Sequence, residues 1–349
     1  MSSDRALILD GFAAESIATG AQLIRAGELL GLPTETVYGL AADAENDAAI
    51  AKIFTAKGRP ADHPLIVHVQ DETGVAHFAS EVPDFANALI KAFWPGPLTL
   101  ILPRRAGVAA AAAGGQNSIG LRSPSHPVAQ ALLKACLDAG ATAQKQVWGI
   151  AAPSANQFGR VSPTTSAHVQ GEFGAGLTIL DGGPCAVGIE STIIDCTRGV
   201  PVLLRPGAIT TEQVQAACGL NVLSKEELLT LAAPAPRASG TLESHYAPNA
   251  KVRLMNAKAL QTALDLIGDG LDVAAGPSIA TYARVILKTR STKVLRRRMP
   301  DDASATAQQL FAVLREFDDQ GVKLIWIETP PDEAEWDGVR DRLLRASAG

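Results

Sequence analysis

The chain has 349 residues, of which 47% are hydrophobic and only 5% aromatic, so it is long enough for two globular domains. Its formal net charge of -5 excludes the overall cationic field that gives a protein non-specific affinity for nucleic acids. The N-terminal sequence lacks the basic start and long apolar run of a signal peptide, and no stretch reaches the ~20 apolar residues of a membrane span, so we expect a cytoplasmic protein without a membrane partner.

Short strand-like and helix-like patterns alternate from Ala13 to about Val202, which predicts an α/β or α+β sheet covered by helices. The predicted strands span residues 28–32, 65–69, 98–102, 178–180 and 191–194. Apolar residues at helical spacing in 85–93 predict one helix, and a proline after His126 predicts the first turn of another. A helix from Ala48 should end at Gly58, which would leave Lys57 and Arg59 on a short exposed turn.

A second, smaller α/β unit is predicted after a linker. Residues 232–240 are rich in Pro, Ala and Gly, a composition typical of linkers. Beyond Ala250 the alternation resumes, and the predicted elements are a strand at 252–255, a helix at 257–267, a strand at 324–327 and a helix at 332–345. The basic run 293–298 could bind an anion, but we favour a solvated charged turn.

The four cysteines form no CxxC pair and have no histidine at zinc-finger spacing. We therefore expect no metal bound by the protein itself. The cysteines should be reduced, buried small hydrophobic residues: Cys136, Cys185, Cys196 and Cys218.

Several small polar segments lie at predicted strand ends or turns, where α/β proteins assemble their sites. The hydroxyls and carboxylate of residues 33–40 could hold a small polar ligand, or the segment could simply cap the next element. Lys57 and Arg59 could bind an anion or could form a structural helix cap. His63 precedes a strand, and His68 lies inside it, where a lone histidine is more often a core residue than a catalyst.

The remaining polar segments show the same balance of functional and structural interpretations. Arg122 ends a predicted strand and could clamp a carboxylate, or could form a surface salt bridge. Ser154 and Asn156 share a tight turn that an Asx or Ser turn would also explain. Cations and neutral donors without a nucleophile–base pair suit a polyanionic substrate, as in nucleotidyl transfer. Kinase-like and hydrolase-like motifs (GxxxxGK[ST], GxGxxG, HExxH, GxSxG) are missing.

The segments occur in the order PTETVYGL, KGRP, HPLIVH, WPGPLT, SIGLR, PSAN, GIEST and LRPG. In this order they resemble the threonylcarbamoyl-AMP synthase family, with its YrdC-like domain, and SGTLESHYAP at 239–248 resembles the linker of the long, two-domain form. The resemblance implies an α/β fold: a twisted, open mixed-sheet YrdC-like domain at 10–217, a linker at 218–250 that closes over the active site, and a Rossmann-like C-terminal domain at 251–349. Residues 138–146 are longer than usual and predict a surface insertion, and residues 241–244 depart from the usual linker.

The resemblance implies an L-threonylcarbamoyladenylate synthase, a nucleotidyltransferase that makes threonylcarbamoyl-AMP and pyrophosphate from L-threonine, bicarbonate and ATP. The product serves the N6-threonylcarbamoyladenosine modification of tRNA, so the implied partners include downstream tRNA threonylcarbamoyl transferase proteins, and a weak tRNA contact stays open. Mg²⁺ is expected on the triphosphate. The alternative function is a tRNA or double-stranded RNA-binding module without catalysis. Carbamoyl transfer for metal-centre maturation is disfavoured because its zinc-finger cysteines are missing.

The resemblance also implies roles for individual residues, carried over motif by motif. The implied catalytic residues around the nucleotide are Lys57, Arg59, Ser154 and Asn156. The implied L-threonine-binding residues are Thr36, His68, Arg122 and Ser191. The implied ATP-binding residues are Arg59, His63, Ser118, Ser154, Arg160, Arg205 and Tyr246, with His245 as a weaker candidate.

Overall fold

The structure is a computed structural model that describes residues 7–138, 145–228, 236–238, 246–268, 270 and 279–349. The chain divides into two compact units, one made of Met1–Phe158 with Ser162–Thr241 and the other of Gly159–Val161 with Leu242–Gly349. His245, residues 241–244, most of the predicted insertion (139–144) and much of the predicted linker (229–235 and 239–245) lie outside the described residues. The predicted domain boundaries therefore stay a prediction.

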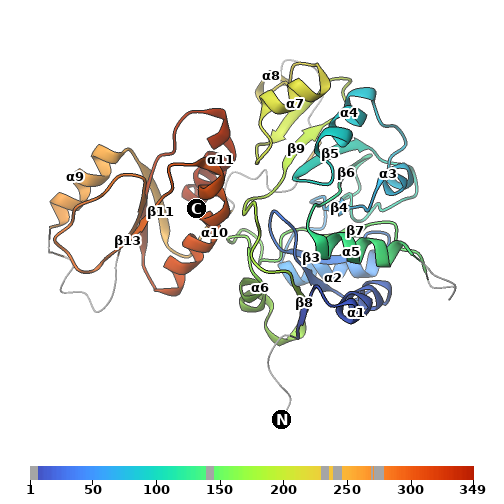
Figure 1. Cartoon of the computed structure of the whole chain (residues 1–349), viewed down its shortest axis with the longest axis horizontal. Helices are drawn as coiled ribbons and strands as arrows, with labels where there is room; N and C mark the ends of the chain where they lie inside the picture. The colour runs from blue at the N-terminus through green and yellow to red at the C-terminus, as the bar shows by residue number, and fades with distance from the viewer. Residues whose placement is uncertain (1–6, 139–144, 229–235, 239–245, 269, 271–278) are drawn as a thin grey trace, which may run out of the picture. The chain divides into compact units, whose positions relative to one another are not determined.

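The first unit is built on a ten-stranded mixed sheet of order β1-β8-β2-β3-β7-β4-β6-β5-β9-β10 (Figure 1). Both parallel and antiparallel neighbours occur, since β4 pairs parallel with β6 while β6 pairs antiparallel with β5. The predicted mixed sheet is thus confirmed. The strands are β1 Ile8–Asp10, β2 Leu30–Leu32, β3 Gly39–Asp43, β4 Ile66–His68, β5 Leu98–Pro103, β6 Ser118–Arg122, β7 Ile150–Ala151, β8 Thr178–Asp181, β9 Thr192–Asp195 and β10 Val202–Arg205.

Helices cover this sheet, and those predicted near 48–57, 85–93 and after His126 are confirmed. The described helices of the unit are α1 Ala14–Arg25, α2 Asp47–Lys57, α3 Glu72–Phe78, α4 Asp84–Phe93, α5 Pro127–Leu137, α6 Ser166–Phe173, α7 Thr211–Cys218 and α8 Lys225–Leu228, with a 3-10 turn at Gly174–Gly176. Helix α5 begins as predicted, with His126 accepting a hydrogen bond from Val128 N and Pro127 in the first turn.

Four central strands carry an apolar row on one face of the sheet, while the other face mixes polar groups with buried apolar residues such as Ile101 and Ile193. Strand register aligns Val67, Leu121, Leu100 and Ile194 in one row across β4, β6, β5 and β9. All four belong to the hydrophobic core that includes Ile50 and Ile53 of α2 and Leu89 of α4. Because successive strand residues point to opposite faces, the adjacent row of residues lies on the other face of the sheet. That row carries the polar groups described below.

Helix α2 begins at a side-chain cap, since Asn46 Oδ1 accepts a hydrogen bond from Ala49 N at 3.2 Å. We expect Asn46→Ala to lower the free energy of unfolding by about 1 kcal/mol, because a buried helix-end donor loses its partner. Asn46→Asp keeps an oxygen acceptor and should cost clearly less. Urea unfolding of both variants measures the difference, and equal losses would refute the capping role.

The second unit contains a four-stranded parallel sheet of order β11-β14-β12-β13 with helices between its strands, so the predicted Rossmann-like α/β fold is confirmed. Its elements are β11 Lys251–Met255, α9 Ala257–Ile267, β12 Ile279–Ala283, β13 Val294–Arg298, α10 Ala303–Asp319, β14 Leu324–Glu328, a 3-10 turn at Ala334–Trp336 and α11 Asp337–Ser347. None of the described helices combines the length and the apolar character that crossing a bilayer would require.

The predicted charged turn at 293–298 is wrong, because these residues form the edge strand β13. Edge strands commonly carry exposed charged side chains, which hinder pairing with another sheet. Two of the arginines make ion pairs, Arg297 with Glu316 and Arg298 with Asp301 at 3.0 Å. The strand is buried only at Val294, and its three arginines are exposed, so the run resembles a charged turn in composition only.

The prediction for the cysteines is largely confirmed. All four are free, and Cys136, Cys185 and Cys196 are buried, but Cys218 at the end of α7 is only half-buried. Burial raises the pKa of the three buried thiols, that of Cys136 to about 12. These thiols are therefore protonated and unreactive at neutral pH.

Candidate functional site

His68, Arg122 and Thr99 align across β4, β6 and β5 to form a row of polar side chains, here called the polar row, which ends at the apolar Ile193 on β9. Arg122 lies beside His68 in the parallel ladder, and Thr99 pairs with Ile193 on the next strand. Leu100 opposes Leu121 in the antiparallel ladder, so Thr99 opposes Arg122. Two predicted threonine-binding residues, distant in sequence, are thus neighbours.

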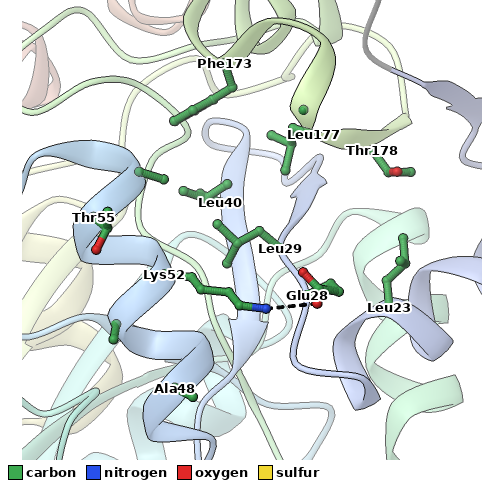
Figure 2. Close-up of a pocket in the computed structure, with 13 residues that line it drawn as sticks. Leu23, Glu28, Leu29, Leu40, Ala48, Lys52, Thr55, Phe173, Leu177 and Thr178 are labelled. Carbon is green, nitrogen blue, oxygen red and sulfur yellow. Dashed lines mark ion pairs between the residues drawn. The ribbon is translucent and has the colours of Figure 1, made fainter. Parts of the chain in front are cut away.

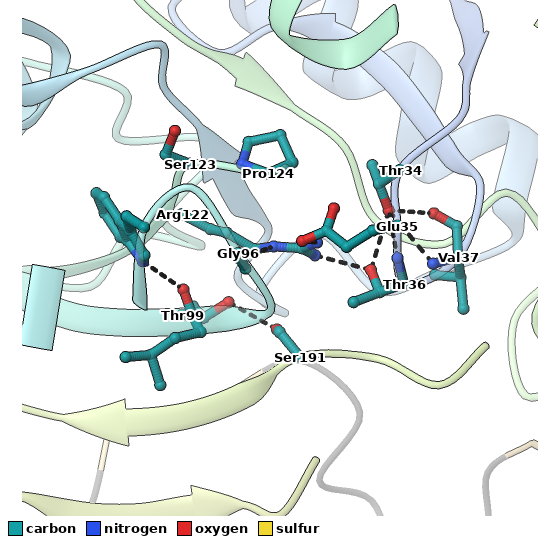
Figure 3. Close-up of polar contacts among 12 residues, drawn as sticks. Thr34, Glu35, Thr36, Val37, Gly96, Thr99, Arg122, Ser123, Pro124 and Ser191 are labelled. Atoms are coloured by element: carbon teal, nitrogen blue, oxygen red, sulfur yellow. Dashed lines mark hydrogen bonds and ion pairs between the residues drawn. The ribbon is translucent and has the colours of Figure 1, made fainter. Parts of the chain in front are cut away.

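Arg122 is a buried arginine that the sheet holds at one end of β6; its side chain is 4% exposed. Its Nε donates to Gly96 O at 3.1 Å and its Nη1 donates to Thr36 Oγ1 at 2.8 Å. Its Nη2 lies 2.6 Å from Glu35 Oε1, and Figure 3 shows the carboxylate directed at the guanidinium. The surface-salt-bridge interpretation is therefore wrong, because the pair is buried.

Thr34 fixes the loop that brings Glu35 and Thr36 to Arg122. Its hydroxyl accepts hydrogen bonds from Thr36 N and Val37 N, both at 3.3 Å, and donates to Val37 O at 2.6 Å. Such a local turn is what a threonine favours outside a helix. The prediction of a turn after the strand is confirmed, although Gly39 and Leu40 already belong to strand β3.

Ser191, directly before β9, and Arg205, at the end of β10, form a second group of contacts. Ser191 Oγ lies 2.7 Å from Thr99 Oγ1, and Arg205 Nη2 donates to Ser191 O at 2.9 Å (Figure 3 labels Ser191 and Thr99). Arg205 Nε also donates to Ser191 O at 3.1 Å. Ser191 and Arg205 are at most 2% exposed, so the predicted threonine-binding serine is linked through Thr99 to the strand beside Arg122.

Lys57 is buried, and the predicted exposed turn is wrong for both cations, since Lys57 is 2% and Arg59 8% exposed. Lys57 Nζ donates to Ser154 O at 2.5 Å and to Asn156 O. Lys57 O accepts from Phe158 N at 2.9 Å. The ammonium thus joins the end of α2 to the turn that carries the other predicted catalytic residues.

Burial, reinforced by the nearby positive charge of Arg59, lowers the pKa of Lys57 to about 7. The carboxylates of Glu172 and Glu190 oppose this shift. The two carbonyl acceptors of the Lys57 ammonium also favour its charged form. A buried amine whose pKa is lowered in this way suits an anionic ligand, because the negative charge of the ligand favours the protonated ammonium.

Arg59 and His63 lie on the segment between α2 and β4. Arg59 Nη2 donates to Pro64 O at 2.9 Å, and the His63 ring lies 5.7 Å from the Phe158 ring. Burial and then the Arg59 charge lower the pKa of His63. His63 is therefore predominantly neutral at pH 7, able to donate and accept one hydrogen bond each.

His68 is also neutral, because burial and the Arg122 charge lower its pKa to about 3. Its Nδ1 has no hydrogen-bond partner among the described residues. A neutral, buried imidazole beside a guanidinium cannot serve as a cation, but it can accept or donate a hydrogen bond to a ligand on this face.

The remaining predicted residues are more dispersed. Ser118 begins β6 on the same face as Arg122 and lines a small hollow together with Arg237 and Ala238, which belong to the described part of the predicted linker. Arg160 and Tyr246 fall in the second unit, where the Tyr246 ring packs 5.5 Å from Phe311. Their predicted contacts with ATP stay predictions.

Sequence reasoning counted the carboxylate of Glu35 only as part of the 33–40 segment, and it overlooked Thr99 and Glu190 as site residues. Glu190 accepts a hydrogen bond from Ser162 Oγ at 2.5 Å, and its charge acts on Lys57. Glu35, Thr99 and Glu190 all lie inside segments singled out by motif (PTETVYGL, WPGPLT and GIEST), so their signal was present. Thr99 lies in an otherwise apolar strand, where only the pairing of strands reveals its neighbours.

A separate hollow of about 640 Å³ holds none of the predicted site residues (Figure 2). Its lining is mostly apolar, with Leu29, Leu40 and Phe173 among the side chains. The ion pair of Lys52 with Glu28, 2.9 Å long, lies in this lining. An anionic substrate finds few uncompensated cations there, so the polar row is the better candidate site.

Comparisons with known proteins place most of the chain in a known family. The Sua5_yciO_yrdC family model, described as telomere recombination, matches residues 22–207, and the model described as threonylcarbamoyl-AMP synthase, C-terminal domain, matches residues 209–348. The threonylcarbamoyl-AMP synthase of Bacillus subtilis is 36% identical, covering 95% of this chain and 93% of that protein. The Pyrococcus abyssi threonylcarbamoyl-AMP synthase is 35% identical, covering 95% of this chain and 94% of that protein.

A solved structure extends the likeness to the fold. The crystal structure of P. abyssi Sua5 complexed with L-threonine has a TM-score of 0.83 and 34% identity, and the match covers 98% of this chain and 97% of that one. Both family models together span nearly all of the described chain, including its polar row. The chain therefore belongs to the threonylcarbamoyl-AMP synthase family.

Proposed function

We propose that this chain is an L-threonylcarbamoyladenylate synthase, a transferase that makes threonylcarbamoyl-AMP and pyrophosphate from L-threonine, bicarbonate and ATP. The product would serve the N6-threonylcarbamoyladenosine modification of tRNA through downstream threonylcarbamoyl transferase proteins. The observation that carries the proposal is the buried Arg122 beside Thr36 and His68, in a chain of this family, since a relative was crystallised with L-threonine.

The proposed chemistry needs positioning rather than a covalent enzyme intermediate. The amine of threonine and bicarbonate form a carbamate, and a carbamate oxygen attacks the α-phosphate of ATP and expels pyrophosphate. Two anions must approach each other, so buried cations lower the barrier. Lys57 and Arg59 are proposed to offset this repulsion, with Ser154 and Asn156 holding the turn that receives the Lys57 ammonium.

The other predicted site residues are divided between the two substrates, L-threonine and ATP. We assign Thr36, His68, Arg122 and Ser191 to L-threonine, and assign to ATP the residues His63, Ser118, Arg160, Arg205 and Tyr246. Mg²⁺ is proposed to arrive on the triphosphate, whose charge it neutralises. The linker 218–250 is proposed, from the family resemblance, to close over the site.

Arg122→Lys should weaken L-threonine binding by about tenfold or more while ATP affinity changes less than about threefold. A lysine keeps the charge but cannot donate to Gly96 O, to Thr36 Oγ1 and to a carboxylate with one planar fork. Calorimetric titration of each ligand into the same variant measures both. An equal loss of the two affinities would contradict the assignment of Arg122 to threonine.

Pyrophosphate release tests the function as a whole. The purified chain is incubated with ATP and Mg²⁺, first with L-threonine and bicarbonate together and then with each omitted. We expect release only when both are present. Release that ignores threonine, or binding of tRNA without any release, would favour the RNA-binding alternative. That alternative, like a weak tRNA contact and a cytoplasmic location, has no support beyond the sequence.

A further inference from the structure

Glu35 is a buried carboxylate whose hydrogen-bonding capacity is largely unused. The residue is 6% exposed, and neither Oε1 nor Oε2 has a hydrogen-bond partner of good geometry among the described residues. Among the described residues, its side chain makes one polar contact, the ion pair with Arg122 at 2.6 Å. An ionised carboxylate has about four acceptor sites, and leaving them unfilled in a buried place is costly.

The loop that carries Glu35 leaves the carboxylate little freedom to turn away. Glu35 O accepts a hydrogen bond from Val187 N at 2.7 Å, which fastens the backbone. The neighbouring hydroxyls are engaged elsewhere, because Thr34 donates to Val37 O and Thr36 accepts from Arg122. Figure 3 shows the Glu35 side chain projecting between Arg122 and the Thr34–Val37 turn.

The other titratable groups that face Glu35 are neutral. Burial raises the pKa of Cys185, and the charge of Glu35 adds to that effect. Burial lowers the pKa of His126, although Glu35 opposes this shift. Arg122, 2.6 Å away, is the positive charge in direct contact with Glu35. The pair is neutral as a whole, with one unused donor direction and several unused acceptor sites.

We propose that Glu35 and Arg122 together receive the zwitterionic end of L-threonine, with Arg122 binding the α-carboxylate and Glu35 accepting hydrogen bonds from the α-ammonium. This assignment of Glu35 rests on the proposed function. A zwitterion brings one charge of each sign to a buried ion pair, so each charge finds a partner and no net charge is buried. A hydroxy acid of the same shape brings only the negative charge, and Glu35 would repel it.

The same position gives Glu35 a place in carbamate formation. As the N–C bond forms and a C–O bond of bicarbonate breaks, the threonine nitrogen loses two protons. One leaves with the bicarbonate hydroxyl as water, and the other must be taken up by a base. Glu35, hydrogen-bonded to that nitrogen, accepts it, and the resulting neutral acid no longer repels the newly formed carbamate.

Glu35→Gln tests the proposal, because the amide keeps the shape and removes the charge. Calorimetry would compare L-threonine with 3-hydroxybutyrate, which lacks only the α-amine. We expect the wild type to prefer threonine by about 10–100-fold, as one charge-assisted contact provides. In Glu35→Gln this preference should fall below about threefold, while 3-hydroxybutyrate binds at least as well as before, since the repulsion is removed.

Two further variants separate this effect from damage to the fold. Asp195→Asn breaks another buried carboxylate–arginine pair on the same sheet, with Arg198 at 2.8 Å, and should leave the threonine preference intact. Glu35→Asp keeps a carboxylate and should restore part of the preference and part of kcat. In Glu35→Gln, kcat at saturating threonine should fall about tenfold or more, because proton uptake is lost.

The outcomes distinguish this inference from the proposed function. If the wild type releases pyrophosphate only with threonine but Glu35→Gln keeps the preference for threonine over 3-hydroxybutyrate, the role of Glu35 is overturned and the function stands. An unchanged kcat in Glu35→Gln would overturn the proton transfer. A wild type that binds neither threonine nor 3-hydroxybutyrate would instead refute the proposed function.

Discussion

Lys57→Met should slow threonine-dependent pyrophosphate release by about 30–150-fold, equivalent to a loss on the order of 2–3 kcal/mol of charge-assisted contact. The ammonium of Lys57 is buried and donates to carbonyls of the turn at 154–156, so it is held in place rather than free to move. Methionine fills similar space without the charge. Lys52→Met, on the same helix but with a partly exposed side chain, is the matched control and should change the rate by less than threefold.

The pH dependence of ATP binding gives an independent test of Lys57. Its pKa is lowered from 10.5 to about 7, mainly by burial, so above pH 7 the free enzyme increasingly carries the neutral amine. If the triphosphate binds the charged form, binding takes up a proton, and ATP affinity of the wild type should fall as the pH rises from 7.5 to 9.5. In Lys57→Met this fall should be absent, and calorimetry across that range measures it.

The same shift predicts the pH dependence of stability. Between pH 7 and 10.5 the unfolded chain binds more protons at Lys57 than the folded chain, so this residue makes the free energy of unfolding rise with pH in that window. Lys57→Met should reduce the rise, and Lys52→Met should not. A rate loss below threefold in Lys57→Met, with an unchanged pH profile, would leave Lys57 as a structural helix cap.

The burial of Lys57 could have been predicted from the sequence. The buried residues of α2 include Ile50, Ile53 and Phe54, and Lys57 follows at the i+7 position of the same stripe. The interpretation as an exposed turn gave more weight to Gly58, which does end the helix in a left-handed conformation. The glycine at position 58 therefore located the end of the helix correctly. Only the helical period of apolar residues shows that the last side chain, Lys57, faces the core.

The polar row was beyond such reasoning. His68, Arg122 and Thr99 become neighbours only through the registers of β4, β6 and β5, and those pairings join segments far apart in the chain. Local pattern predicts that a strand exists, but a register shift of one residue would turn each side chain to the other face. The motif order indicated which residues matter, whereas the partnership of Glu35 with Arg122 required the folded sheet.

Gly207→Ala should destabilise the protein by about 2–3 kcal/mol, the upper range for an overpacked site. A Cβ at Gly207 would lie 2.4 Å from Thr192 N and 2.8 Å from both Glu190 O and the carbonyl carbon of Ser191. All three are backbone atoms, which cannot rotate aside as a flexible side chain can. The turn at 205–207 must therefore move away from the turn at 190–192, or the latter must shift.

Gly171→Ala is the matched control, because it adds the same methyl group where nothing lies within 4 Å. Gly171 lies inside α6, where alanine is the better helix former, so this variant should be neutral or more stable by up to about 1 kcal/mol. Urea unfolding should therefore show that the same added methyl group lowers the free energy of unfolding at Gly207 but leaves it unchanged or raises it at Gly171. Equal effects would show that the close approach at Gly207 is not what restricts that position.

Gly207→Ala should also weaken threonine binding, since the displaced turn carries Ser191, which contacts Thr99 beside Arg122. A shift of the 190–192 backbone would break the hydrogen bonds from Arg205 to Ser191 O, at 2.9 and 3.1 Å, before it disturbed the Arg122–Thr36 contact on the other side of the row. Loss of stability with unchanged threonine affinity would place Ser191 outside the threonine site. If Gly207→Ala lowers both stability and threonine affinity, and Arg122→Lys weakens threonine binding selectively, then Ser191 and Arg122 contact the same threonine ligand.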